Sequence, residues 1–391
     1  NSRGSIFARR GDTSACMRPS LLLISHAYAA LENRKKLQAL AAHVDLVCVT
    51  SVIETHAVLG RSAADFDNES DAPARRYELI RLPRLGRGIT TFIYRGLGNI
   101  MRSRRFDVVL VENEPWAFVR WQARLLAGLH QRGALFGEFT WENVSRPGWK
   151  GMVLSLIYRA AAATTDFVIA GNQAAGRLFG IAEPHLLVAP QIGVDLENHQ
   201  PASLSDRNTL REACGLPRDA FIVGYCGRFA EEKGLRELVQ ACEEVGGLHL
   251  AVLGSGSLEP WLREEASKKP WLHLLPPRTH TEIPDFLRCL DVFVLASKPV
   301  RSMKLCWEEQ FGHVLIEAMA CGVATLGSRS GAIPEVLGDE AALFPSGDAT
   351  GLAQRIREHR VREAHVELVL VDRDLEEALL LEVRERHPRH H

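Results

Sequence analysis

The stretch EEQFGHVLIEAMACGVATLGSRSGAIPEV, residues 308–336, carries two carboxylates eight positions apart, Glu309 and Glu317. Gly312 between them lets the chain turn into a helix that begins near His313. Glu309 then stays on the loop before the turn, and Glu317 lies one turn inside the helix. The spacing therefore predicts two carboxylates on either side of a helix N-terminus rather than on one helical face.

Short apolar runs recur along the chain and alternate with amphipathic segments. Runs of mostly β-branched residues and Leu suit strands that are buried on both faces of a parallel sheet. They lie at 21–25, 45–50, 107–112, 134–139 and 166–170, and again at 221–226, 248–254, 271–275, 291–297 and 323–328. We predict an α/β protein with two doubly wound, Rossmann-like domains that face a cleft.

Length and composition place the domain boundaries. A chain of 391 residues is too long for one ordinary core. We predict an N-terminal α/β domain over 20–200, a linker rich in turn formers over 201–218, and a C-terminal α/β domain over 219–354. The polar residues 1–19 show no periodicity and are expected to form a disordered extension. The charged residues 355–391 form an atypical C-terminal tail.

The overall composition excludes several classes of protein. No run of about 18 apolar residues occurs, so no membrane-spanning helix is expected. The eight cysteines form no C-x-x-C pair, which favours reduced, buried thiols in a cytoplasmic protein.

One segment departs from the near-neutral net charge of the chain. Arg75 to Arg105 holds nine arginines and a single acid, Glu78. The segment is either a solvated face or a surface for anionic lipid headgroups or a phosphorylated acceptor. It contains no recognised nucleic-acid-binding motif, so no nucleic-acid partner is expected.

The motif GYCGRFAEEKG, residues 224–234, predicts a diphosphate site. A strand ends at Cys226, Gly227 makes a tight turn, and Arg228 and Lys233 flank the start of the next helix. Two cations beside a helix N-terminus suit an anionic ligand. The alternative is that both are ordinary surface cations.

Glycines and backbone donors complete the predicted ligand site. Gly254 and Gly256 follow a strand and would let a backbone approach a ligand closely. No third glycine follows, so this is not a dinucleotide fingerprint. An anion would accept hydrogen bonds from the backbone N–H groups at the helix start, which belong to Gly312, His313, Val314 and Leu315. The alternative reading of Glu309 and Glu317 is two unrelated surface acids.

These motifs together resemble a known family. The segment 224–234, the E-x7-E pair around Phe-Gly, SGAIPEV (330–336) and FPSGD (344–348) are similar to those of the retaining glycosyltransferases of the GT-B fold, family 4 (glycosyl transferases group 1). QIGVD (191–195) resembles the family's segment before the linker, with Gln191 and Ile192 as departures. The resemblance covers roughly residues 20–350.

The resemblance implies a donor site in the C-terminal domain. Arg228 and Lys233 would neutralise the leaving diphosphate, Glu309 would contact the donor sugar, and Glu317 would bind the ribose hydroxyls. No cofactor and no metal are expected beyond the nucleotide-sugar co-substrate, UDP- or GDP-linked. The D-x-D patterns at 65–67 and 372–374 lie in polar or charged stretches away from any strand end and are not interpreted as metal sites.

The acceptor side is expected in the N-terminal domain. The stretch ENRKK resembles a subgroup in which Asn33 and Arg34 open the first helix near the cleft, and His26 ends the first strand. A lone histidine can equally be a satisfied structural residue. In the segment EFTWENV the residues expected to face the acceptor are Trp141, Glu142 and Asn143.

The leading hypothesis is a retaining, metal-independent glycosyltransferase that moves a sugar to a glycan or lipid-type acceptor. Such a protein would serve polysaccharide or glycolipid biosynthesis in the cytoplasm, with a peripheral contact at the inner face of an anionic membrane through Arg75–Arg105. Two alternatives stay open: a non-catalytic nucleotide-sugar-binding GT-B protein, and a GT-B nucleotide-sugar epimerase.

Overall fold

The computed structural model describes residues 18–31, 33–52, 75–86, 88–302 and 306–362. The chain divides into two compact units. The first takes residues up to 140 together with 152–169 and 179–187, and the second takes 141–151, 170–178 and everything from 188 onward. The predicted N-terminal domain, 20–200, therefore includes three stretches that cluster with the second unit.

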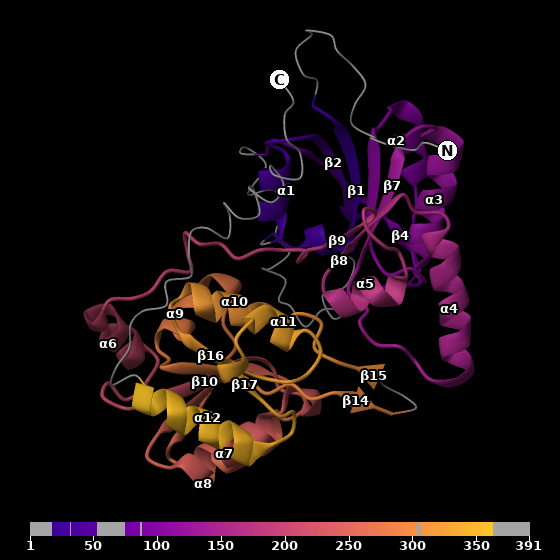
Figure 1. The fold of residues 1–391 in the computed structure, drawn as a ribbon. Coiled ribbons are helices and arrows are strands. Elements are labelled where there is room, and N and C mark those ends of the chain that lie inside the picture. Colours follow the sequence, from indigo (N-terminus) through magenta and orange to yellow (C-terminus); the bar gives the residue numbers. More distant parts are fainter. Residues whose placement is uncertain (1–17, 32, 53–74, 87, 303–305, 363–391) are drawn as a thin grey trace, which may run out of the picture. The chain divides into compact units, whose positions relative to one another are not determined.

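The first unit is built on a seven-stranded sheet, whose last two strands are β8 and β9 (Figure 1). Its strand order is β3-β2-β1-β6-β7-β8-β9, and the pairs from β3 to β7 are parallel. The strands are β1 (Ser20–Ile24), β2 (Asp45–Ser51), β3 (Glu78–Leu82), β6 (Val108–Glu112), β7 (Leu135–Thr140), β8 (Phe167–Ala170) and β9 (Leu186–Val188). The helical segments of the first unit are η1 (His26–Ala29), α1 (Arg34–Leu40), α2 (Leu97–Ser103), α3 (Phe118–His130) and, from residue 152 onward, α4 (Gly148–Ala162). Helix α5 (Gln173–Phe179) clusters with the second unit up to residue 178. A small ribbon pairs β4 (Arg84–Leu85) with β5 (Ile93–Tyr94).

Alternate residues of β1 enter two different cores. Leu22 and Ile24 pack in one cluster, and Leu21 and Leu23 pack in the other. Successive side chains of a strand point to opposite faces of the sheet, so a strand covered on both faces must be apolar throughout. This explains the unbroken apolar run at 21–24.

A six-stranded parallel sheet, in the order β12-β11-β10-β13-β16-β17, forms the second unit. Its strands are β10 (Ile222–Arg228), β11 (His249–Ser255), β12 (Leu272–Leu275), β13 (Val292–Leu295), β16 (Ala324–Ser328) and β17 (Leu343–Phe344), beside a ribbon of β14 (Val300–Arg301) and β15 (Cys306–Trp307). The α-helices are α6 (Leu204–Ala213), α7 (Leu235–Val245), α8 (Glu259–Lys268), α9 (Ile283–Arg288), α10 (His313–Ala320), α11 (Ile333–Leu337) and α12 (Ala349–Arg362). Single 3-10 turns are η5 (Glu231–Lys233), η6 (His280–Glu282) and η7 (Glu340–Ala342).

The predicted fold class, with two doubly wound α/β units, is confirmed. The ten predicted strands all occur. The edge strands β3, β9 and β17 and the two ribbons, β4–β5 and β14–β15, are additional strands that their local sequence did not indicate. The cleft predicted between the two domains stays a prediction. Within the described ranges, no helix is long and apolar enough to cross a membrane.

The segment 201–218 is more than a linker, because it contains α6. Asp291 accepts hydrogen bonds from the guanidinium of Arg211, at 2.8 Å, and from that of Arg207. Arg211 Nε also donates a hydrogen bond to the Cys289 carbonyl, at 2.9 Å. Most of the predicted N-terminal extension, residues 1–17, lies outside the described residues. Of the predicted C-terminal tail, residues 355–362 belong to α12, and the rest lies outside the described residues.

Candidate functional site

Gly312 starts α10 as the sequence predicts. Its φ of 81° lies in the left-handed region, and a Cβ there would lie 2.7 Å from Leu295 Cδ2. The helix runs from His313, which confirms the predicted turn. The Leu315 N–H already donates to the Gly312 carbonyl at 2.8 Å, so this one of the four predicted backbone donors is engaged within the chain.

Glu309 lies buried on the loop before that turn and forms the centre of a polar cluster. Its Oε2 accepts hydrogen bonds from Lys233 Nζ at 2.6 Å and from Ser297 Oγ at 2.7 Å. Lys233 Nζ also lies 4.7 Å from the centroid of the Trp307 ring. The structure thus brings two of the predicted site residues into contact, and the ammonium group stabilises the buried carboxylate.

The backbone of Glu309 is held by the segment SGAIPEV. The Glu309 carbonyl accepts hydrogen bonds from the Ala332 N–H and from Asn143 Nδ2, both at 2.9 Å. Gly331, with φ of 54°, packs so closely that a Cβ would lie 2.0 Å from the same carbonyl oxygen. Asn172 Nδ2 donates to the next carbonyl, that of Gln310, at 2.8 Å. The position of the carboxylate is therefore set by contacts from three separate segments.

Arg228 is engaged differently from Lys233. It ends β10, its side chain is 66% exposed, and its guanidinium lies 3.1 Å from Glu232. Its carbonyl accepts a hydrogen bond from Tyr225 Oη at 2.7 Å. The structure thus pairs the two predicted cations with different carboxylates, and leaves the guanidinium of Arg228 largely open to solvent.

Chain packing explains the glycines after β10 and β11. Gly227 and Gly254 are partners in the parallel pairing, and a Cβ on Gly254 would lie 1.9 Å from the Gly227 carbonyl oxygen. A Cβ on Gly256 would lie 2.5 Å from the Phe229 carbonyl oxygen. Packing of the chain against itself thus accounts for the glycines at 254 and 256, and the close approach of this backbone to a ligand stays a prediction.

Glu317 and His313 are the titratable groups of α10. Burial raises the pKa of the Glu317 carboxyl to about 7, and His280 Nε2 lies 3.8 Å from it. Burial lowers the pKa of His313 to about 4, against a smaller opposing effect of the Ile192 backbone. Val314 is partly buried beside them. At neutral pH the helix start therefore carries a neutral imidazole, and the carboxyl of Glu317 is close to half ionised.

The predicted acceptor-side residues of the first unit mostly hold the turn after β1. Asn33 Nδ2 donates to the Ala27 carbonyl at 2.8 Å. The buried Arg34 donates to the carbonyls of Tyr28 and Ala29, each at 3.0 Å. His26 packs edge-on to Phe92, and burial and Arg84 lower its pKa. These contacts assign structural work to Asn33 and Arg34.

The segment EFTWENV reaches the Glu309 loop. Trp141 Nε1 donates to Gln191 Oε1 at 2.9 Å, and its ring lies 5.7 Å from that of Phe311. Glu142 lies 3.5 Å from Arg146, and burial raises the pKa of its carboxyl. Together with the bond from Asn143, these contacts place the segment against the loop that carries Glu309.

Sequence reasoning missed several residues of these clusters. In the second unit they are Ser297, Asn172 and Trp307. In the first unit, Glu112 at the end of β6 accepts hydrogen bonds from Tyr28 Oη at 3.0 Å and Lys36 Nζ at 2.6 Å. The available signals were the position of Ser297 directly after a buried strand and the second lysine of ENRKK.

Among the residues that the structure describes, no group of three His, Cys, Asp or Glu side chains could hold a metal ion. The two D-x-D patterns, at 65–67 and 372–374, lie outside the described residues.

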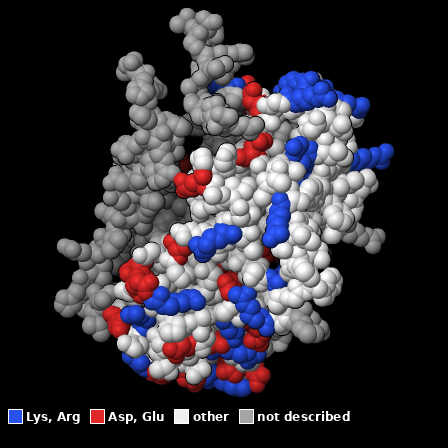
Figure 2. Space-filling model, turned by 45° about the vertical axis from the view of Figure 1, so that its right-hand side comes forward, with Lys and Arg blue, Asp and Glu red and all other residues white. Residues whose placement is uncertain are grey.

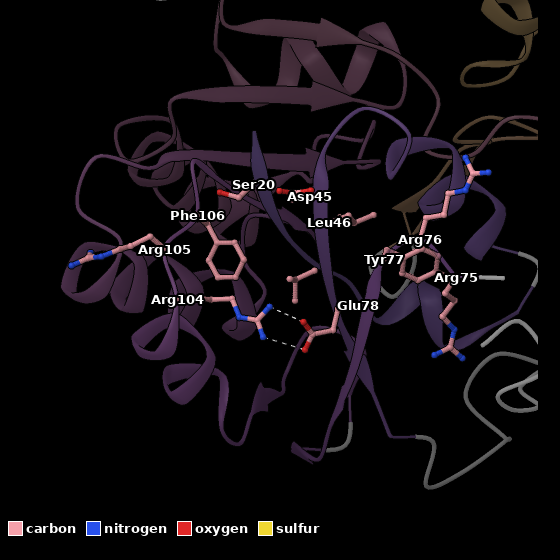
Figure 3. Close-up of a pocket in the computed structure, with 11 residues that line it drawn as sticks. Ser20, Asp45, Leu46, Arg75, Arg76, Tyr77, Glu78, Arg104, Arg105 and Phe106 are labelled. Atoms are coloured by element: carbon pink, nitrogen blue, oxygen red, sulfur yellow. Dashed lines mark hydrogen bonds and ion pairs between the residues drawn. The ribbon is translucent and has the colours of Figure 1, made fainter. Parts of the chain in front are cut away.

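The arginine-rich segment borders a hollow of about 590 Å³ at the amino ends of β1, β2 and β3 (Figure 3). Arg104 makes a two-pronged ion pair with Glu78, at 2.6 and 3.2 Å. Figure 3 shows the side chains of Arg75, Arg76 and Arg105 directed away from one another. The arginines therefore do not converge on one bound anion.

The second unit is similar in sequence to known proteins. Residues 220–359 match the family model described as "Glycosyl transferases group 1". The D-inositol 3-phosphate glycosyltransferases of Mycobacterium tuberculosis and Mycobacterium bovis are 29% identical over 166 residues, which is 40% of this chain. The chain spans about a third of the length of these curated relatives, 32%.

Solved structures share the fold over most of the chain. HepE from Anabaena, solved in complex with UDP, gives a TM-score of 0.63 at 15% identity and covers 93% of this chain and 100% of that one. A glycosyltransferase from Rickettsia africae gives 0.64 at 14% identity, covering 88% and 89%. Sucrose-phosphate synthase from Thermosynechococcus elongatus gives 0.60 at 20% identity, covering 89% and 91%. These likenesses show that the chain has the GT-B fold, and residues 220–359 of its second unit are similar to the group 1 glycosyltransferase family.

Proposed function

We propose that the chain is a retaining glycosyltransferase that moves a sugar from a nucleotide-diphosphate sugar to a glycan or lipid-type acceptor. The observation that carries the proposal is the buried cluster in which Lys233 and Ser297 hold the carboxylate of Glu309. It lies beside α10, whose Glu317 is suited to accept hydrogen bonds from ribose hydroxyls. The family match over 220–359 covers all four of these residues.

The proposed chemistry builds negative charge on the leaving diphosphate and positive charge on the sugar ring. The cations Arg228 and Lys233 would stabilise the first, together with the start of α10. The carboxylate of Glu309 would face the sugar. In this proposal the cations do the work that a divalent metal performs elsewhere, and transfer needs no added metal.

UDP is the first nucleotide to test, because HepE was solved with UDP and with UDP-glucose. We expect one of UDP, GDP, ADP, CDP and dTDP to raise the melting temperature. At a large excess over its dissociation constant, the nucleotide should stabilise the fold by roughly 2–4 kcal/mol. No shift with any of the five would contradict a formed donor site.

Glu309→Gln tests the catalytic part of the proposal. We expect nucleotide binding to survive while transfer falls by about 10²-fold or more, because the charge facing the sugar is lost. Glu340→Gln, which removes an exposed carboxylate paired with Arg329, is the matched control. Unchanged transfer in Glu309→Gln would contradict the assigned role.

Product analysis separates the remaining readings. Retention predicts that the product keeps the anomeric configuration of the donor sugar, which NMR reads directly. Nucleotide binding without turnover for any acceptor would indicate a non-catalytic binding protein. Conversion of the donor sugar without an acceptor would indicate an epimerase.

A further inference from the structure

Helix α4 exposes an apolar stripe instead of a polar one. Trp149, Met152, Val153 and Leu156 have the i, i+3, i+4, i+7 spacing of one helical face, and all are 46–70% exposed. The opposite side of the helix is also apolar, with Tyr158 and Ala161 buried. A helix on a water-exposed surface normally turns polar residues outward, so this face is suited to an apolar environment.

Helix α3 adds a second stripe beside the first. Phe118, Leu125 and Leu129 lie on one face of it and are 56–65% exposed. The two helices are joined where Arg124 Nε donates to the Thr164 carbonyl at 2.8 Å, just after α4. Helix α3 and residues 152–162 of α4 belong to the first unit and lie on the same flank of its sheet (Figure 1). We call these seven apolar residues together the α3–α4 face.

The charges on the two helices of the α3–α4 face have one sign. Neither helix contains an Asp or a Glu, whereas α4 carries the exposed cations Lys150 and Arg159. From 114 to 166 two acids are buried or largely buried beside arginines, Glu138 against Arg120 and Glu142 beside Arg146. Glu114 is half-buried and accepts a hydrogen bond from Thr140, and the exposed Asp166 accepts the Phe136 N–H. Figure 2 turns this flank toward the viewer and shows a mostly white surface with scattered blue side chains on its right-hand part.

We propose that the α3–α4 face docks onto an anionic lipid bilayer, with both helices lying along the membrane surface. Its apolar side chains would enter the boundary between headgroups and acyl chains, where Trp, Phe and Leu partition favourably. Lys150 and Arg159 would meet the headgroup phosphates. This surface differs from the contact predicted at Arg75–Arg105, and the proposal does not depend on the identity of donor or acceptor.

The charge pattern favours a membrane over a second copy of the chain. A two-fold interface places the same patch against itself, so this face would bring its cations against the cations of the other copy, with no acid on either helix to pair them. An anionic bilayer supplies the opposite charge continuously.

The test is co-sedimentation of the full chain with vesicles of phosphatidylcholine, with and without phosphatidylglycerol. We expect binding to the anionic vesicles that weakens with salt. The double variant Met152→Gln/Leu156→Gln should bind at least about tenfold more weakly, because two apolar side chains no longer enter the bilayer. Lys150→Gln/Arg159→Gln should lose about tenfold on anionic vesicles only.

Two matched controls accompany these variants. Leu204→Gln removes an exposed leucine on α6, and Arg263→Gln removes an exposed cation on α8; both should bind vesicles like the parent chain. A variant counts as folded if the nucleotide raises its melting temperature as much as that of the parent chain. If the parent shows no such shift, an unchanged melting temperature serves instead. Failure of the parent chain to bind, or equal binding of the Met152→Gln/Leu156→Gln variant, would overturn the proposal. So would a dimer in solution that this variant abolishes.

Discussion

Glu317 shows how one buried carboxyl makes stability depend on pH. Its pKa is raised by burial to about 7, from a usual value near 4.5. Between these two pH values the folded chain binds a proton that the unfolded chain has released. The free energy of unfolding therefore falls as pH rises through this window, and the loss is complete above about pH 7.

Glu317→Gln should remove that loss. We expect the variant to match the parent near pH 4 and to exceed its free energy of unfolding at pH 8 by up to about 3 kcal/mol. Denaturant unfolding at a series of pH values measures the difference. Glu197→Gln, at an exposed position, controls for the amide substitution. A parent whose stability relative to Glu317→Gln is constant from pH 4 to 8 would contradict the raised pKa.

At the level of elements, the connection between β16 and α11 positions the Glu309 loop. Gly331 in this connection lies against the Glu309 carbonyl, which also accepts the Ala332 N–H. The motif SGAIPEV is thus explained by backbone packing: a side chain at its glycine would push the Glu309 loop away. The second half of the motif, from Ile333 onward, forms the start of α11.

Gly331→Ala should therefore impair both folding and activity. We expect a loss of about 3 kcal/mol or more, because left-handed strain adds to the clash with Glu309. Transfer should fall by about 10²-fold through misplacement of the carboxylate. Gly338→Ala is the matched control: its φ is 64°, and a Cβ there meets nothing within 4 Å. It should cost only about 1–2 kcal/mol; equal losses in the two variants would refute the packing argument.

At the scale of the whole molecule, each unit has its own core. The second unit is built around one large apolar cluster, and the first around two clusters on the faces of its sheet. Compact units with separate cores commonly unfold in separate steps, so a single free energy of unfolding does not describe the chain. The predicted donor residues from Gly227 to Glu317 all belong to the second unit.

Calorimetry should then resolve two transitions. We expect saturating UDP, at about 100 times its dissociation constant, to stabilise the second unit by about 2.7 kcal/mol and to leave the other transition nearly in place. Leu22→Ala, a core substitution, should reduce the free energy of unfolding of the first unit by about 2–5 kcal/mol and so lower the temperature of its transition. One transition that responds to both changes would show that the units unfold together.

The local sequence alone determined the α/β class, the strand positions and the start of α10 at Gly312. These depend on signals within a few residues: apolar runs that suit two-faced burial, and a glycine that can adopt positive φ. It also singled out Lys233 and Glu309, although their direct contact joins residues 76 positions apart. The additional strands β3 and β9 escaped because edge pairing leaves little apolar signal.

Only the tertiary structure decided which side chains share a cluster and which support the chain. Ser297, Asn143 and Asn172 reach the Glu309 loop from distant segments, and no local pattern encodes such meetings. Gly254 and Gly256 serve strand packing, and Arg34 holds a turn. The apolar stripe of α4 reads in sequence like an ordinary core helix. Its exposure depends on what the rest of the fold leaves uncovered, because burial is a property of the packed chain.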